Sequence, residues 1–190
     1  VHMEIFEGSY GGRLGKDGMD AVDTLYANTR NNPIEDIETH LPLRVLRYEL
    51  REDVAGAGKW RGGLGSVREF TFLGDGGASV EGEGHRYRPW GFLGGSEGMP
   101  ARLDLMVPGQ PDRALPSKVP YMHIGKDGRF VCYGPAGGGY GNPLERDPAD
   151  VADDVLDGVI SVETALRDYG VVVSAEGIVD QDATTKARGG

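Results

Sequence analysis

Two carboxylates and an imidazole alternate along the segment 79–85, a spacing that could hold a metal ion or move protons. If the segment is a β-strand, Glu81, Glu83 and His85 share one face, because successive strand residues point to opposite sides. Neighbours on such a face lie about 7 Å apart, and together they could ligate a divalent metal or transfer protons. The alternative, which the sequence favours, is a solvated strand face whose intervening glycines let a neighbouring segment approach.

A second set of candidates lies in the first forty residues. The stretch 28–38 is dense in hydrogen-bonding side chains, and loops of this kind either are solvated or line a binding site. Both alternatives stay open. Our first candidates to line a substrate site are Asp20, Asn28, Arg30, Asn31 and Glu35, and our second candidates are Glu81 and His85. We assign no catalytic residue and expect no metal ligand on this chain.

The glycine cluster 134–141 could suggest a nucleotide-binding loop, but it fits no G-x-G-x-x-G register. The glycine-lysine-serine/threonine sequence of a phosphate-binding loop occurs nowhere in the chain. We therefore predict a loop against which other backbone segments pack closely. Cys132 lies in an apolar strand context, which favours a buried structural thiol over a nucleophile.

The elements that must position these residues are mostly extended. Patterns of apolar residues predict strands that begin near Leu43 and Val67 and strands over 78–87, 103–107 and 130–133. The tetrapeptide Gly-Lys-Asp-Gly at 125–128 separates two apolar runs, which predicts a β-hairpin. The same tetrapeptide at 15–18 is interpreted as a loop.

The chain becomes helical after residue 141. Asp147 followed by Pro148 predicts a helix start, and Gly158 predicts its end. Ser161 and Gly170 bound a second predicted helix, and residues 182–188 could form a last turn. The predicted fold class is mainly β (α+β), a glycine-rich antiparallel β module with a short helical C-terminal tail.

The predicted organisation has three parts. Residues 1–42 form an extended polar segment that packs on a partner or a missing domain, because so long a stretch without regular structure is unusual in an isolated domain. Residues 43–141 form the β-rich core, and residues 142–190 form the helical tail.

Composition excludes several classes of protein. The 190 residues carry 30 acidic and 20 basic side chains, a net charge of −10 that argues against nucleic acid or an anionic membrane as the partner. No apolar run approaches the roughly 20 residues that a membrane span needs. One cysteine cannot form an internal disulfide or a four-cysteine zinc site, so we expect a cytoplasmic setting.

Several blocks of the sequence resemble the hydantoinase B/oxoprolinase family, which includes the large subunits of acetone and acetophenone carboxylases. The blocks follow one another in order along nearly the whole chain, which makes the resemblance specific. They are residues 10–13, 15–21, 28–35, 48–51, 56–63, 89–91, 94–95, 135–140, 157–158 and 167–171.

The resemblance covers only the carboxy-terminal part of the family's subunit. It implies that the metal-binding segment lies in the amino-terminal part of the subunit and that a hydantoinase A-like subunit handles ATP. This chain is then expected to bind no cofactor itself, while ATP and a divalent metal belong to the complete assembly. Its expected partners are the A-like subunit, the amino-terminal part of the B-type subunit and a small cyclic amide or ketone.

The function implied is ATP-dependent opening of a cyclic amide, such as a hydantoin or oxoproline, through phosphorylation of the carbonyl or enol oxygen. The chain alone is expected to be inactive. Two alternatives remain: part of an ATP-dependent ketone carboxylase, or a β-rich assembly module without chemistry that contacts other subunits through its glycine-lined surfaces.

Overall fold

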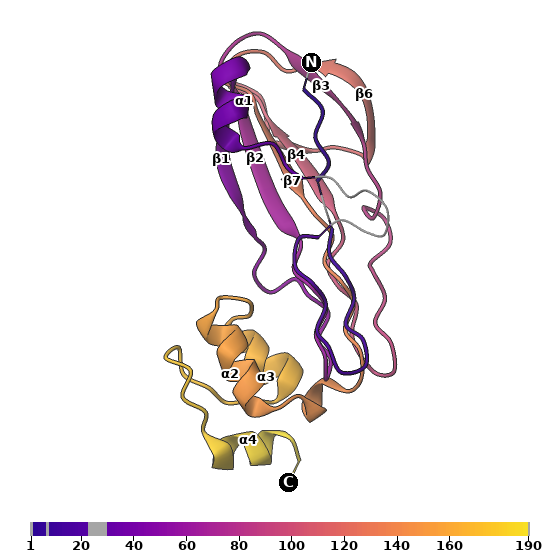
Figure 1. Cartoon of the computed structure of the whole chain (residues 1–190), viewed down its shortest axis with the longest axis vertical. Coiled ribbons are helices and arrows are strands. Elements are labelled where there is room, and N and C mark those ends of the chain that lie inside the picture. Colours follow the sequence, from indigo (N-terminus) through magenta and orange to yellow (C-terminus); the bar gives the residue numbers. More distant parts are fainter. Residues whose placement is uncertain (1, 7, 23–29, 190) are drawn as a thin grey trace.

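The computed structural model describes residues 2–6, 8–22 and 30–189, so the candidate Asn28 lies outside the described residues. Figure 1 shows an elongated molecule with strands at one end and most helices at the other. The strands are β1 (Leu43–Leu50), β2 (Ser66–Phe72), β3 (Gly77–Glu81), β4 (Arg102–Met106), β5 (Arg113–Ala114), β6 (Lys118–His123) and β7 (Arg129–Tyr133). The helices are α1 (Ile34–His40), η1 (Pro143–Glu145), α2 (Pro148–Leu156), α3 (Val162–Tyr169) and α4 (Gln181–Ala187).

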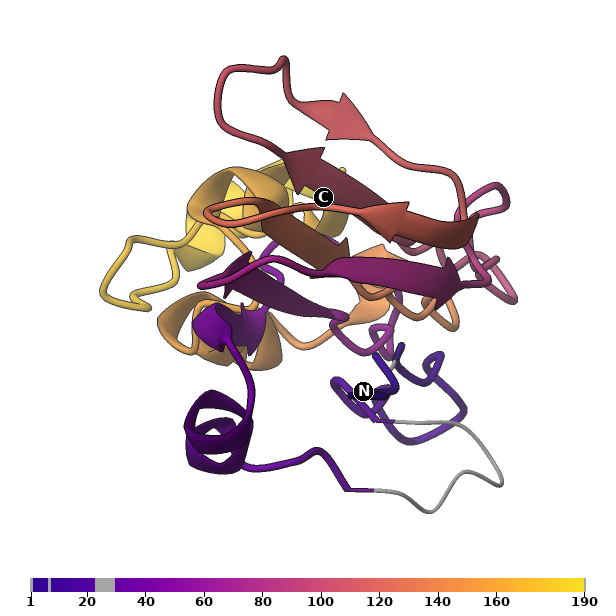
Figure 2. The same ribbon diagram turned by 90° about the horizontal axis from the view of Figure 1, so that it is seen from above.

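The strands form two antiparallel sheets. One sheet has the order β1-β2-β7-β4-β5, and the other pairs β3 with β6. The end-on view in Figure 2 shows the strands together with α1, which packs beside the edge strand β1. Together with the helices at the carboxyl end, these sheets confirm the predicted fold class.

An apolar core fills the space between the two sheets. Leu103 and Leu105 of β4 pair with Cys132 and Phe130 of β7, and all four side chains are buried. Residues of β3 and β6, including the buried Val119, pack against them. Burial of these apolar side chains is the main stabilising contribution at this end of the molecule.

A buried arginine fastens the first residues of the chain to the sheet. Arg68 of β2 is 1% exposed, and its Nη2 lies 2.6 Å from a carboxylate oxygen of Glu4. The guanidinium also lies 4.1 Å from the ring centre of Tyr48, and Phe6 contacts Phe70 edge-to-face. Residues 4–6 are therefore held by both charge and aromatic packing.

The predicted β-hairpin at 125–128 is wrong. β6 pairs with β3, whereas β7 pairs with β2 and β4, so the turn carries the chain from one sheet to the other. The turn's backbone bonds to the connection before β3: Asp127 N–H donates to Phe72 O, and Ile124 N–H donates to Gly76 O. These long-range bonds separate the two strands that follow one another in sequence.

The strand predicted over 78–87 ends early. β3 stops at Glu81, and the chain then turns, with Gly84 at φ +72°. A backbone in that left-handed region cannot continue a strand. The common face proposed for Glu81, Glu83 and His85 is therefore wrong.

A short helix lies where the sequence analysis left a loop. In α1, Ile34 and the buried Ile37 lie three residues apart, and Glu35 and Asp36 occupy the first turn, where carboxylates favour a helix. Pro33 O accepts the first hydrogen bonds of the helix, from Asp36 and Ile37.

Below the sheets, four extended segments pack backbone against backbone. We call the set the glycine bundle; it consists of residues 8–12, 56–65, 89–98 and 134–141. Gly12 N–H donates to Gly138 O, and Gly139 N–H donates to Ser96 O, so the segments are joined by hydrogen bonds. A Cβ added at Gly137 would lie 2.0 Å from Tyr10 O. This close approach confirms the loop predicted for residues 134–141.

The carboxyl end folds into short helices over a second core. Asp147 accepts a hydrogen bond from Ala149 N–H at the start of α2, and Ser161 accepts one from Thr164 N–H at the start of α3. Both predicted helix starts are confirmed. Buried apolar residues of α2 and α3 pack against Val54, Ala57, Leu64 and Ala136 next to the glycine bundle. Within the described residues, no helix has the length and apolar character required to cross a membrane.

Candidate functional site

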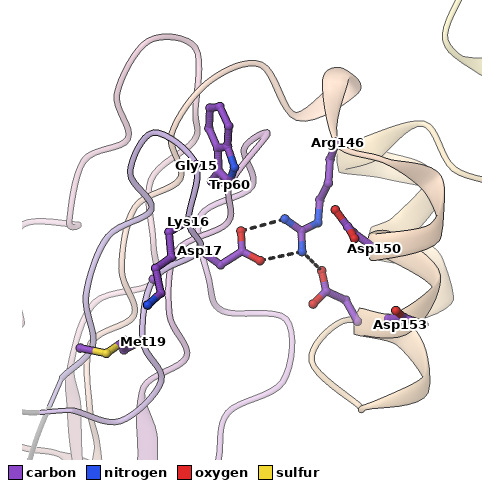
Figure 3. Close-up of a pocket in the computed structure, with 10 residues that line it drawn as sticks. Gly15, Lys16, Asp17, Met19, Trp60, Arg146, Asp150 and Asp153 are labelled. Carbon is purple, nitrogen blue, oxygen red and sulfur yellow. Dashed lines mark hydrogen bonds and ion pairs between the residues drawn. The ribbon is translucent and has the colours of Figure 1, made fainter.

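A cluster of five charged residues joins the amino-terminal loop, the glycine bundle and α2. We call it the ionic anchor; its members are Asp17, Asp20, Arg61, Arg146 and Asp154. Figure 3 shows part of it in the wall of an open cavity of about 540 Å³. The other lining residues include Lys16, Trp60, Asp150 and Asp153.

Arg146 is the centre of the contacts seen in Figure 3. Its Nη1 and Nη2 donate to the two carboxylate oxygens of Asp17 at 2.8 and 2.9 Å, a bidentate geometry that strengthens an arginine–carboxylate pair. Nη2 also lies 2.8 Å from Asp154 Oδ2. One guanidinium thus links the loop at residues 15–18 to α2.

Arg61 makes the second half of the anchor. Its Nε donates to Asp154 Oδ1 at 3.0 Å, and its Nη1 donates to Asp20 Oδ1 at 3.0 Å. The same oxygen of Asp20 accepts Leu64 N–H at 2.7 Å, and Asp17 Oδ1 accepts Arg61 N–H at 2.8 Å. Asp20, a candidate to line a substrate site, is thus held in place by the glycine bundle.

The electrostatics of the anchor follow from burial and pairing. Burial disfavours the charged form of Arg146, but Asp17 and Asp154 outweigh it and raise the pKa of the guanidinium. The pKa of Arg61 is raised in the same way, because burial is outweighed by Asp154 and Asp20. Burial raises the pKa of the neighbouring Tyr169 phenol. The guanidiniums therefore stay charged, and the anchor is suited to fixing three segments rather than to transferring protons.

A larger cavity, of about 780 Å³, is lined by residues of β3, β4, β6 and β7 and by residues 3–6. The lining of this cavity is mainly apolar and includes both Glu81 and His85. Glu83 pairs with Lys118 at 2.9 Å, and hydrogen bonding to Lys118 lowers the pKa of this carboxyl group. His85 Nδ1 lies 3.0 Å from the carbonyl oxygen of Glu83, so the ring lies against its own loop.

Neither cavity is arranged as a metal centre. Within the described ranges, no group of three or more His, Cys, Asp or Glu residues is placed to hold a metal ion. Cys132 lines the larger cavity, but burial raises the pKa of its thiol, which disfavours the reactive thiolate.

The remaining candidates lie beside the edge strand β1. Arg30 and Glu35 are exposed, and the side-chain amide of Asn31 donates to the hydroxyl of Tyr48. In the described part of the chain, neither Arg30 nor Glu35 forms an ion pair. The candidates therefore occupy three places: Asp20 at the anchor, Arg30 to Glu35 beside β1, and Glu81 and His85 at the larger cavity.

Sequence reasoning missed four members of the ionic anchor: Asp17, Arg61, Arg146 and Asp154. Arg61 and Asp154, which share a hydrogen bond, are 93 positions apart in the sequence, and Arg146 and Asp17 are 129 positions apart. No local sequence pattern could therefore have predicted these pairs. The one available signal was Arg61 next to Gly62 and Gly63, where a long charged side chain adjoins residues that require close packing.

Comparison with known proteins identifies the family. Residues 1–143 match the model of the Hydantoinase B/oxoprolinase family. A Pseudomonas sp. (strain NS671) protein named as the B-type subunit of a D-/L-hydantoinase is 56% identical over 189 residues, covering 99% of this chain and 32% of that protein. The chain belongs to the hydantoinase B/oxoprolinase family.

Two solved structures share the fold. The crystal structure of an ATP-dependent caprolactamase from Pseudomonas jessenii matches with a TM-score of 0.84 and 28% identity, covering 96% of this chain and 33% of that one. A nucleotide-free acetone carboxylase matches with a TM-score of 0.76 and 24% identity, covering 91% of this chain and 28% of that one. The chain spans about a third of the length of these relatives.

Proposed function

We propose that this chain is the carboxy-terminal part of a B-type subunit in an ATP-dependent enzyme that opens cyclic amides. The observation that carries the proposal is the 56% identity to the B-type subunit of a hydantoinase over 99% of the chain. The 28% identity to an ATP-dependent caprolactamase supports the same class, because a lactam and a hydantoin are both cyclic amides.

Amide bonds resist hydrolysis because the carbonyl carbon is a weak electrophile. Transfer of the γ-phosphoryl group of ATP to the amide oxygen would release ADP and activate that carbon. Attack by one water would then break the ring C–N bond and leave an acyl phosphate, and a second water would hydrolyse the acyl phosphate to the carboxylate and inorganic phosphate. We propose that this chain contributes to the cavity in which these steps occur, while the nucleotide is bound by a hydantoinase A-like subunit.

The glycine bundle supports this division of labour. A phosphate-binding loop needs backbone N–H groups directed at the ligand. In segment 134–141, Gly137 N–H donates to Gly63 O, Gly139 N–H to Ser96 O and Gly141 N–H to Phe92 O. These donors are satisfied within the protein, so this glycine-rich segment serves packing in the proposal.

The segment that precedes α1 is the proposed contribution to the substrate site. Arg30, which forms no ion pair with any residue that the structure describes, carries an exposed guanidinium suited to a developing negative charge on an amide oxygen. Asn31 offers both a donor and an acceptor to a ring amide. Glu35 lies in the first turn of the adjoining helix and is exposed. Asp20 acts by fixing the loop through the ionic anchor.

The proposal is tested on the assembly isolated from its source cells. Native mass spectrometry should find this sequence in a complex with an A-type subunit, and a divalent metal is expected in the rest of that assembly. The complex should hydrolyse ATP in step with opening of hydantoin, oxoproline or caprolactam. ATP hydrolysis that none of the cyclic amides stimulates would contradict the proposal.

A second candidate is part of an ATP-dependent ketone carboxylase, favoured by the structural match to acetone carboxylase. In that case ATP hydrolysis would require acetone or acetophenone together with bicarbonate.

A non-catalytic assembly module would leave the rate unchanged when Arg30 or Asn31 is replaced by alanine, whereas a bulky residue at Gly63 or Gly138 would disrupt the complex.

A further inference from the structure

The loop 87–93 exposes four large apolar side chains within seven residues. Tyr87 is 73% exposed, Trp90 80%, Phe92 59% and Leu93 65%. Single exposed apolar residues are common on protein surfaces, but several large ones exposed within one short loop point to an interaction surface. Tryptophan and tyrosine are also the residues that most often dominate binding energy in protein interfaces.

Residues 89–93 of the loop belong to the glycine bundle and are held by its segment 134–141. Phe92 N–H donates to Gly139 O, and Gly141 N–H donates to Phe92 O, both at 2.9 Å. A Cβ added at Gly138 would lie 2.0 Å from Trp90 O, so the backbone of the loop is in direct contact with segment 134–141. The apolar side chains are therefore presented on a fixed backbone, which reduces the entropy lost on docking.

The turn at the tip of the loop carries backbone strain. Leu93 has φ +49°, a region that residues with a branched side chain rarely adopt, and Gly94 follows at φ +96°. Strain of this kind persists where the surrounding structure fixes it, and it is concentrated at functional sites. Here it directs an exposed leucine outward.

The exposed residues continue into an aromatic row on the bundle. The ring centroids of Phe92 and Tyr140 are 5.7 Å apart, and the ring centroids of Tyr140 and Trp60 are also 5.7 Å apart. Arg86 precedes the loop and Arg88 lies within it, and neither forms an ion pair within the part of the chain that the structure describes. The loop thus combines exposed apolar side chains with two arginines, one of which lies 5.3 Å from the centre of the Tyr87 ring.

We infer that loop 87–93 docks on the part of the same subunit that lies outside this chain. The relatives are about three times as long as this chain, so each offers a large additional surface within the same polypeptide. Obligate interfaces between proteins have more apolar centres than transient ones, and two parts of one polypeptide are always present together. The occupant is expected to be an apolar surface with carboxylates opposite Arg86 and Arg88. The inference rests on the proposal that this chain is the carboxy-terminal part of a longer B-type subunit, and not on the proposed reaction.

The test is hydroxyl-radical footprinting followed by mass spectrometry, which measures the oxidation rate of individual side chains. The rates of Tyr87, Trp90 and Phe92 are compared between the 190-residue chain and the full-length subunit that contains it. Each rate is normalised to Tyr121, which is 70% exposed and lies on β6. The normalised rate of Trp90 should fall severalfold in the full-length subunit alone.

Any one of four results would overturn the inference. Trp90 could be oxidised equally fast in the chain and in the full-length subunit. Its protection could appear only after an A-type subunit is added, which would assign the loop to that partner. Its protection could appear in the isolated chain as concentration rises, which would assign it to a second copy. In the full-length subunit, L93D should restore Trp90 oxidation while leaving Tyr121 unchanged, and a failure to do so would also contradict the inference.

Discussion

The ionic anchor and the segment from Arg30 to Glu35 use the same kinds of side chain in opposite ways. In the anchor, Arg146 is 4% exposed and contacts two carboxylates, whereas Arg30 is exposed and has no ion pair within the described residues. Buried charges must be paired because leaving water is costly, and the pairs then fix the segments that carry them. An exposed, unpaired charge remains available to a ligand. On this comparison we propose that the anchor is structural and that the segment beside β1 contacts substrate.

Removal of the shared carboxylate should have the largest effect on stability. Asp154→Ala leaves Arg61 and Arg146 buried with one carboxylate fewer, and breaking a buried pair in this way costs about 3–5 kcal/mol. Urea unfolding of the chain measures the loss. Asp153→Ala is the matched control, because Asp153 is the exposed neighbour on the same helix and should change the free energy of unfolding by less than about 0.5 kcal/mol. Equal effects of the two variants would contradict the role of the anchor.

The glycine bundle should tolerate added atoms less well than an open loop does. Gly138→Ala places a Cβ 2.0 Å from Trp90 O, and overpacking of this kind costs about 1–3 kcal/mol or more. Gly74→Ala is the control, because its nearest contact is 3.5 Å away. Thermal unfolding should show a lower Tm only for Gly138→Ala. A similar Tm for both variants would show that the glycine bundle can accommodate an added side chain, which would contradict the close packing of its segments.

A smaller effect is expected at the start of α3, where the carboxylate of Asp53 accepts Ser161 N–H at 2.8 Å. Burial alone would raise the pKa of Asp53, but hydrogen bonds from Ser161 and Thr164 outweigh it and lower the pKa below 3.8. A lowered folded-state pKa stabilises the protein above pH 3.8, and this stability is lost as pH falls through the folded value. The group is exposed, so the contribution should be below about 1 kcal/mol.

Urea unfolding at a series of pH values checks this expectation. Asp53→Asn should be slightly less stable than the unchanged chain at neutral pH, and the difference should shrink as pH falls below 3.8. A difference that grows at low pH would contradict the sign of the shift.

The local features of the fold could be predicted from sequence, and the non-local ones could not. Asp147 and Ser161 start helices because their caps involve residues two or three positions away. The hairpin prediction failed because the turn at 125–128 bonds to residues 72 and 76, far back in the chain. The early end of β3 depends on Gly84 adopting a positive φ, which the alternating pattern of side chains does not reveal.

The same distinction applies to the candidate site. The density of polar groups in residues 28–38 was visible in the sequence, but the partners of Asp20 were not. Arg61 lies 41 residues away from Asp20, and only folding brings them together. For this reason the sequence could not separate a residue that fixes a loop from one that is free to contact substrate.

The most direct test of this account compares Arg30→Ala with Asp20→Ala in the complete enzyme. Turnover of the cyclic amide and Tm are measured for both variants, with Arg30→Lys as the conservative control. Arg30→Ala should lower kcat with little change in Tm, Arg30→Lys should restore part of the rate, and Asp20→Ala should lower Tm. An unchanged kcat in Arg30→Ala, or an unchanged Tm in Asp20→Ala, would contradict the assignment of substrate contact to one region and of structure to the other.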